Sequence, residues 1–169
     1  MRFKDTTEGF HKRLQSHALV YAGFDPTADS LHLGHLSGLV GLRKLQLQGH
    51  SPIVLAGGFT AMIGDPSGRS SERNLLSADE VAHNVFCIEP QLRMLLDFDC
   101  ENSARLVNNA DWTNELTLLA FLRDIGKHFT VASMVNRDTV QSRLASGLSF
   151  TEFSYSLIQA NDFLHLFNE

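Results

Sequence analysis

Three short apolar runs alternate with stretches of helical periodicity, and this alternation restricts the fold more than any other feature of the chain. The runs cover Ala18–Phe24, Pro52–Gly58 and Ser103–Asn109, and the first two end in turn residues. Short, continuously apolar runs of this kind are typical of strands buried on both faces of a parallel sheet. Strand, helix, strand, helix, strand therefore predicts an α/β fold with a right-handed parallel sheet of Rossmann type, present as its first half.

The stretches between the runs carry helix signals. Apolar residues recur at helical spacing from Leu33 to Gln48, and Gly49 follows as a C-terminal glycine. A second helix begins after Ser77 as N-cap, and Pro90 is expected to kink or divide it. Beyond about residue 112 the pattern is helical only, which predicts one domain with a half Rossmann fold over about 1–112 and a helical lobe over about 113–169. The helices expected in the lobe cover 115–125, 131–135, 137–145 and the chain from residue 149 on.

Composition excludes several classes of protein. The chain has 169 residues and a formal net charge of -5, which argues against a surface built to bind nucleic acid by charge alone. Neither a signal peptide nor an apolar run of about 18 residues is present, so no membrane partner is expected and we expect a cytoplasmic chain. Cys87 and Cys100 form no CxxC pair, which fits a reducing compartment.

The first chemical motif is "DPTADSLHLGHL", from Asp25 to Leu36, which joins the first expected strand to its helix. Ligands of open α/β sheets bind beyond the carboxyl ends of the strands, where a helix N-terminus favours phosphate. His32 and His35 can donate to phosphate or ribose oxygens, and Gly34 allows a close approach to the backbone. A zinc site is the alternative, but no third ligand of suitable spacing follows, and a further alternative is two solvated histidines.

The second motif, "GGFTAMIGDPSGRSSER", runs from Gly57 to Arg73 after the second expected strand. It is rich in glycine but is not a Walker loop, because its spacing is one residue short and an arginine stands where lysine belongs. We expect a flexible loop in which Asp65 binds a ligand ammonium group and Arg69 and Arg73 bind phosphates. The alternative is a surface turn with unrelated charges.

The third motif is the last helix, which begins after a capping box formed by Ser149 and Glu152. Tyr155, Gln159 and Asp162 follow at i, i+4 and i+7, within about 60° of arc on one face. A row of this composition suits a zwitterion or a phenol, since it combines acceptors for N–H and O–H with an amide for a carboxylate. The alternative is a solvated stripe.

Four segments of the sequence are similar to bacterial tyrosyl-tRNA synthetases, which are class I aminoacyl-tRNA synthetases. They are "YAGFDPTADSLHLGH", "GDPSG", "FLRDIGKHF" and "SFTEFSYSLIQANDF", and the similarity extends from about Leu19 to the end. "HLGH" resembles the HIGH signature, with which the family stabilises the triphosphate of ATP while tyrosine attacks the α-phosphate. The resemblance therefore favours a phosphate and ribose role for the histidines over a metal site.

By position, the resemblance assigns roles to individual residues. Tyr21 and Asp162 resemble the pair that hydrogen-bonds the substrate phenol, and Asp25 resembles a contact to the tyrosyl backbone. Thr27 and His32 resemble contacts to the γ-phosphate, and His35 a ribose contact. The residues expected around the substrate ammonium group are Asp65, Tyr155 and Gln159, with Thr60 beside them.

The resemblance also implies substrates and partners: L-tyrosine, ATP accompanied by Mg²⁺, tRNA(Tyr), and a second copy in a homodimer, with no metal bound by the protein itself. Ala22, Gly38 and Ala110 depart from the cysteine, threonine and tyrosine that are common in the family. Ribose contacts are therefore expected to differ.

The chain ends before the GSDQWGN and KMSKS segments of the family, so we expect a catalytic-domain fragment with little activity of its own. One alternative is tryptophanyl-tRNA synthetase, against which the pair Tyr21 and Asp162 argues. The other is a non-catalytic dimerisation or binding module.

Overall fold

The computed structural model describes residues 8–67 and 75–169. Its strands are β1 (Leu19–Phe24), β2 (Ser51–Ala56) and β3 (Arg105–Asn108). The helices before the lobe are α1 (Phe10–Arg13), α2 (Leu33–Gln46), α3 (Thr60–Ile63), α4 (Ala78–Arg93) and α5 (Ala110–Thr113). The helices within the lobe are α6 (Leu118–Ala120), the π-helical η1 (Phe121–Ile125), the 3₁₀ turn η2 (Gly126–His128), α7 (Val131–Val135), α8 (Asp138–Leu144) and α9 (Phe150–Asn168).

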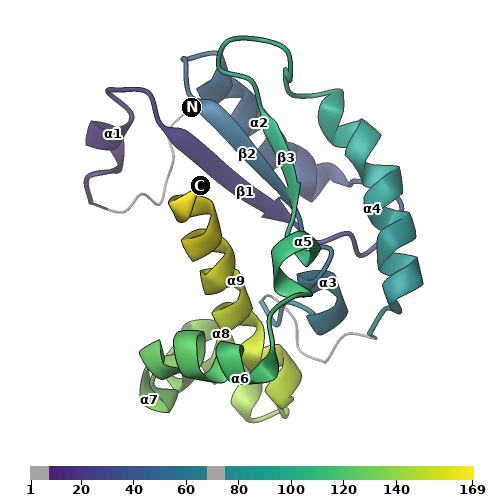
Figure 1. The fold of residues 1–169 in the computed structure, drawn as a ribbon, viewed down its shortest axis with the longest axis vertical. Coiled ribbons are helices and arrows are strands. Elements are labelled where there is room, and N and C mark those ends of the chain that lie inside the picture. The colour runs from purple at the N-terminus through teal and green to yellow at the C-terminus, as the bar shows by residue number, and fades with distance from the viewer. Residues whose placement is uncertain (1–7, 68–74) are drawn as a thin grey trace.

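The three strands form one parallel sheet in the order β1-β2-β3, which confirms the predicted fold class. Leu19 of β1 pairs with Ser51 of β2, and Ile53 of β2 pairs with Arg105 of β3. All three carboxyl ends therefore lie at one edge of the sheet, as Figure 1 shows. Side chains that follow the three strands are brought together at this edge.

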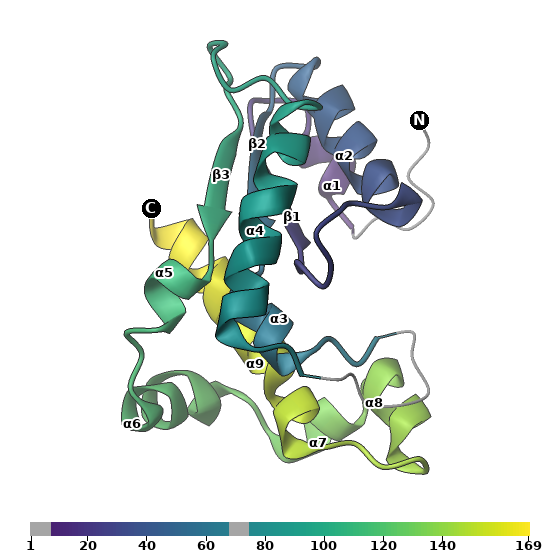
Figure 2. The same cartoon turned by 90° about the vertical axis from the view of Figure 1, so that its right-hand side faces the viewer.

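Helices cover both faces of the sheet, because side chains alternate along the buried strand β2. Val54 faces a core built by α2 and α4, and it packs in one cluster with Leu39 and Ile88. Ile53 and Leu55 point to the opposite face, where they contact Leu166 of α9. Figure 2 shows α2 and α4 on one side of the strands and α9 on the other. The last helix is thus tied to the sheet by apolar burial.

The helical lobe lies below the sheet in Figure 1, and α9 runs out of it to the sheet. Ser149 caps α9 by accepting from the Glu152 amide, as predicted, but the return bond of the expected capping box, from the Ser149 amide to the Glu152 carboxylate, does not form. Glu152 forms a buried ion pair with Arg143 of α8, and Nη2 of Arg143 lies 2.9 Å from Oε2 of Glu152. This pair fixes the start of α9 against the lobe. The expected boundary of the lobe near residue 113 stays a prediction.

Several local predictions differ from the structure. Pro90 does not divide α4, which continues to Arg93. It lies in the last turn, so only one helical N–H is lost. The helix expected over 115–125 begins later, with Thr117 as N-cap, and becomes π-helical from Phe121. The single-turn helices α1, α3 and α5 were not predicted. Gly49, in contrast, has the positive φ of 91° expected of a C-terminal glycine.

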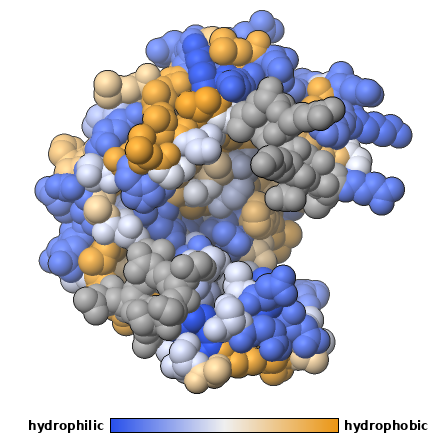
Figure 3. Space-filling view, turned by 180° about the vertical axis from the view of Figure 1, so that it is seen from behind, coloured by the Kyte–Doolittle hydropathy of each residue, from blue (hydrophilic) through white to orange (hydrophobic). Residues whose placement is uncertain are grey.

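One side of the molecule is hollowed between the sheet and the helical lobe, as the space-filling view in Figure 3 shows. Apolar side chains gather along the lower edge, over the lobe. Within the part of the chain that the structure describes, no helix is both long enough and apolar enough to cross a membrane.

Candidate functional site

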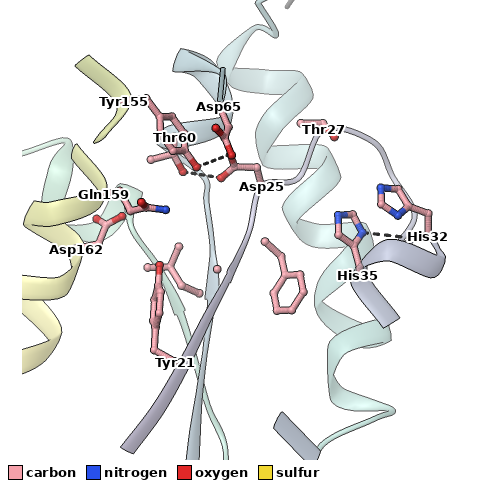
Figure 4. A pocket seen from close by; sticks show the side chains of 13 residues that line it. Tyr21, Asp25, Thr27, His32, His35, Thr60, Asp65, Tyr155, Gln159 and Asp162 are labelled. Carbon is pink, nitrogen blue, oxygen red and sulfur yellow. Dashed lines mark hydrogen bonds between the residues drawn. The ribbon is translucent and has the colours of Figure 1, made fainter. Parts of the chain in front are cut away.

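A cavity of about 290 Å³ opens where the carboxyl ends of β1 and β2 meet α9 and the start of α2. This volume is near the lower limit of about 300 Å³ for small-molecule sites, so it suits a ligand of amino-acid size. Figure 4 shows the side chains that converge on it. Ten residues selected from the sequence line it: Tyr21, Asp25, Thr27, His32, His35, Thr60, Asp65, Tyr155, Gln159 and Asp162.

Asp25 lies at the upper end of the cavity and receives two hydroxyl groups. The Thr60 hydroxyl donates to Oδ1 across 2.7 Å, and the Tyr155 hydroxyl donates to Oδ2 across 3.0 Å. Gly57 makes this arrangement possible, because a Cβ at that position would lie 2.0 Å from Asp25 Oδ1. The glycine-rich turn after β2 is therefore needed to accommodate the carboxylate.

Asp162 of α9 is buried at the other end and is held by two donors. Asn109 Nδ2 donates to Oδ2 across 3.1 Å, and Trp112 Nε1 donates to Oδ1 across 2.9 Å. The Asn109 amide also donates to Thr60 Oγ1 across 3.1 Å, so it connects the two ends of the cavity. Each carboxylate oxygen of Asp162 retains a lone pair for a ligand hydroxyl.

Asn109 and Trp112 were not selected from the sequence. Asn109 is fully buried, and its Oδ1 accepts from the Phe59 amide across 2.8 Å. The signal that could have found both residues is the segment "NNADW", because it follows β3 and so belongs to the edge at which the strands end.

Tyr21 and Tyr155 point their hydroxyl groups toward the acidic groups of the cavity. Burial raises the pKa of both phenols well above the ordinary value, and Asp162 and Asp25 raise the pKa of Tyr21 further. Both hydroxyls therefore keep their protons at neutral pH and can donate. The Tyr21 ring packs edge-on against Phe163, with centroids 4.9 Å apart, which fixes its direction.

The cavity is acidic. Asp25, Asp65 and Asp162 are among its lining residues, and none of the described residues that line it is a lysine or arginine. Burial raises the pKa of Asp162, whereas the hydrogen bonds from Asn109 and Trp112 lower it. Three carboxyl groups with no lysine or arginine among the described lining residues suit a ligand that brings its own positive charge, such as an ammonium group. Gln159 adds an amide between the two ends.

His32 and His35 stand at the N-terminus of α2, and their rings stack with centroids 3.8 Å apart. His32 Nδ1 accepts from the Gly34 amide across 3.1 Å, and His35 Nδ1 accepts from the His32 amide across 3.3 Å. Each neutral ring therefore carries its proton on Nε2, which is the donor left for a ligand. Burial, followed by the neighbouring His32, lowers the pKa of His35.

Gly34 does not itself line the cavity. A Cβ there would lie 2.9 Å from the His32 ring, so the glycine gives this ring its space in the cap. Arg69 and Arg73, the expected phosphate contacts, lie outside the described residues. Among the residues that are described, no cluster of three or more His, Cys, Asp or Glu side chains could hold a metal ion. The departures Ala22, Gly38 and Ala110 do not line the cavity either.

Comparisons with known proteins agree with this geometry. A family model described as "tRNA synthetases class I (W and Y)" matches residues 12–169. The chain is 58% identical to a tyrosine–tRNA ligase of Opitutus terrae over 155 residues, which cover 90% of this chain and 36% of that protein. It is 53% identical to a tyrosine–tRNA ligase of Anaeromyxobacter dehalogenans over 165 residues, or 97% of this chain and 39% of that protein.

Solved structures show the same likeness. A C-terminally truncated mitochondrial tyrosyl-tRNA synthetase of Aspergillus nidulans superposes with a TM-score of 0.83 at 33% identity, over 92% of this chain and 48% of that one. The fold and these matches thus define the N-terminal part of a class I aminoacyl-tRNA synthetase. The chain belongs to the tyrosyl-tRNA synthetase family within that class. It spans little more than a third of the length of the curated relatives named here, 36% and 39%.

Proposed function

We propose that this chain supplies the tyrosine site of an enzyme that activates L-tyrosine with ATP and transfers the tyrosyl group to tRNA(Tyr). The observation that carries the proposal is the polarity of the cavity. One end presents the Tyr21 hydroxyl and the Asp162 carboxylate, and the other presents Asp25, Asp65 and Tyr155. A ligand with a phenol at one end and an ammonium group at the other fits this distribution.

In the proposed complex, the substrate phenol donates to Asp162 and accepts from Tyr21. This pair favours tyrosine, because phenylalanine would leave both buried polar groups without the hydroxyl they need. Tryptophan could donate its indole N–H to Asp162, but it offers no acceptor for the Tyr21 hydroxyl. The substrate ammonium group binds between Asp65, Tyr155 and Gln159, where negative charge and acceptors are concentrated.

ATP binds on the side of α2. Its phosphates approach the helix N-terminus, with Thr27 and the Nε2–H group of His32 contacting the γ-phosphate, while the Nε2–H group of His35 contacts the ribose. The substrate carboxylate attacks the α-phosphorus, and pyrophosphate leaves with the electron pair of the broken P–O bond. The nucleophile is already ionised, so positioning and charge stabilisation suffice. Mg²⁺ accompanying ATP would supply positive charge to the triphosphate, and Arg69 and Arg73 are the residues expected to add to it.

The same proposal includes a cytoplasmic homodimer. The helical lobe exposes apolar side chains that a monomer would leave in water, and Phe150 is 76% exposed. Exposed apolar area of this kind marks an interface. The other members of this set are Leu118, Leu119, Leu122 and Val131.

Amino-acid-dependent exchange of pyrophosphate into ATP tests the proposed activity. The polypeptide that the natural gene encodes is assayed with tyrosine, phenylalanine and tryptophan. We expect exchange with tyrosine and far less with the other two. Residues 1–169 alone should give little or none, because they hold only one side of the phosphate site. Exchange with tryptophan instead would favour the tryptophanyl enzyme, and no exchange by the gene product would favour a non-catalytic module.

A further inference from the structure

His165 forms a stack that the proposed chemistry does not use. It lies one turn after Asp162 on α9, and its imidazole stacks on the indole of Trp112, with centroids 4.2 Å apart and an interplanar angle of 17°. In addition, His165 Nε2 lies 3.2 Å from Oε1 of Glu169. The imidazole is therefore held both by a carboxylate and by an aromatic face.

The position of the Trp112 side chain depends on tertiary contacts such as the stack with His165. It belongs to α5, a helix of four residues whose N-cap makes no side-chain hydrogen bond. A helix this short has little stability of its own, so its side chains are held by their tertiary contacts. Apolar contacts hold part of the indole against the cluster of Ile53, Leu55 and Leu166. The stacked imidazole supplies the other restraint.

We propose that His165 is a positioning residue for phenol recognition: its ring holds the Trp112 indole so that Nε1–H stays on Asp162. This inference rests on the proposed tyrosine site. Asp162 receives the substrate hydroxyl, and the 2.9 Å bond from Trp112 sets the direction of its carboxylate. His165 does not line the cavity and acts through Trp112. Its loss should therefore reduce the preference for tyrosine over phenylalanine and leave KM for ATP unchanged.

Charge supports the same assignment. The ionisable groups around His165 are Asp162 and Glu169 on α9, with Arg105 of β3 paired to Glu169. Burial raises the pKa of Asp162, the hydrogen bonds from Asn109 and Trp112 lower it, and the electrostatic effect of His165 lowers it by the smallest amount. His165 therefore favours the ionised, acceptor-only form of the carboxylate, which is the form that accepts from a phenol.

Substitutions at His165 test the proposal in the polypeptide that the natural gene encodes. H165A removes the stack, H165F keeps an aromatic ring that can stack, and H11A removes an exposed histidine of α1 as a matched control. The ratio of kcat/KM for tyrosine to that for phenylalanine is measured by pyrophosphate exchange. We expect H165A to lower this ratio roughly 3- to 10-fold, the value of about one hydrogen bond. H165F should restore it to within about twofold, and KM for ATP should not change.

An unchanged ratio in H165A, or a ratio in H165F as low as in H165A, would overturn the proposal. Trp112 emission gives a second measurement that needs no activity, taken as the difference between each protein and its W112F counterpart. The stacked imidazole covers one face of the indole, so acrylamide should quench Trp112 emission more strongly in H165A than in the parent, and H165F should restore the protection. Equal quenching in the parent and in H165A contradicts the stack. Absence of tyrosine-dependent exchange in a parent that shows this protection would contradict the proposed function alone.

Discussion

The Tyr155 hydroxyl donates to Asp25 Oδ2 across 3.0 Å, and this bond joins the last helix to the end of β1 over 130 residues of sequence. The network continues from Asp25 through Thr60 and Asn109 to Asp162. Hydrogen bonds in a buried site strengthen one another and keep their groups in place. Both ends of the cavity are therefore set before a ligand binds.

Removal of the Tyr155 hydroxyl should weaken the ammonium end of the site. In Tyr155→Phe, Asp25 loses one donor and the substrate ammonium group loses one acceptor. We expect tyrosine to bind roughly tenfold more weakly, since hydrogen bonds to charged groups contribute about 1.5–3 kcal/mol. KM for ATP is the internal control and should stay constant. Unchanged tyrosine affinity in calorimetry would contradict the role of Tyr155.

His32→Ala and His35→Ala should slow adenylate formation far more than they weaken tyrosine binding. Their Nε2–H groups face the nucleotide, and loss of one donor that acts on transition-state charge costs about 10² to 10³ in rate. Pre-steady-state adenylate formation measures the rate, with tyrosine titrated separately. His83→Ala, an exposed histidine of α4, is the matched control. Adenylate formation at the parent rate in both variants would show that "HLGH" has another role.

Acid should loosen the start of α2. The folded-state pKa of His35 lies below its ordinary value of about 6.5, because burial disfavours the charged ring. The stability contributed by the neutral ring is therefore fully present above pH 6.5 and is lost as the pH falls through the lowered pKa. Amide exchange of His32, whose N–H bonds to His35 Nδ1, should rise relative to other amides over that range. His35→Gln should remove the dependence, and a dependence that survives it would contradict the assignment.

Phe150→Asp should shift the protein from dimer to monomer in sedimentation, because a carboxylate would be buried in the expected interface. Phe86→Asp on α4 is the matched control, since Phe86 is 75% exposed and Phe150 76%. It should leave the mass unchanged. A monomeric mass in the parent, or a dimer that survives Phe150→Asp, would rule out the interface on the helical lobe.

Local sequence patterns predicted the strands and the helix that carry the site, because strand and helix formation depend on residues close together in the sequence. The apolar runs correspond to strands that begin within two residues of the expected starts, and the spacing of Tyr155, Gln159 and Asp162 placed them on one face of α9. The alternative interpretation of these three residues as a solvent-exposed stripe is wrong, since Asp162 is 1% exposed.

Long-range contacts were not predicted, and they decide the roles of Asn109 and Trp112. Their bonds to Asp162 cross 53 and 50 residues, and no spacing in the sequence reports them. Single-turn helices such as α3 and α5 were not predicted either, because four residues are too few to show a helical periodicity.

Calorimetric titration of the natural gene product with tyrosine and with phenylalanine tests the tyrosine site most directly. The predicted result is tighter binding of tyrosine by at least about tenfold, because phenylalanine brings no hydroxyl to bond with the Tyr21 hydroxyl and the Asp162 carboxylate. Tyr21→Phe should narrow this gap, and residues 1–169 alone should show the same order with weaker affinities. Equal affinity of the parent for the two amino acids would contradict the assignment of Tyr21 and Asp162 to the substrate phenol.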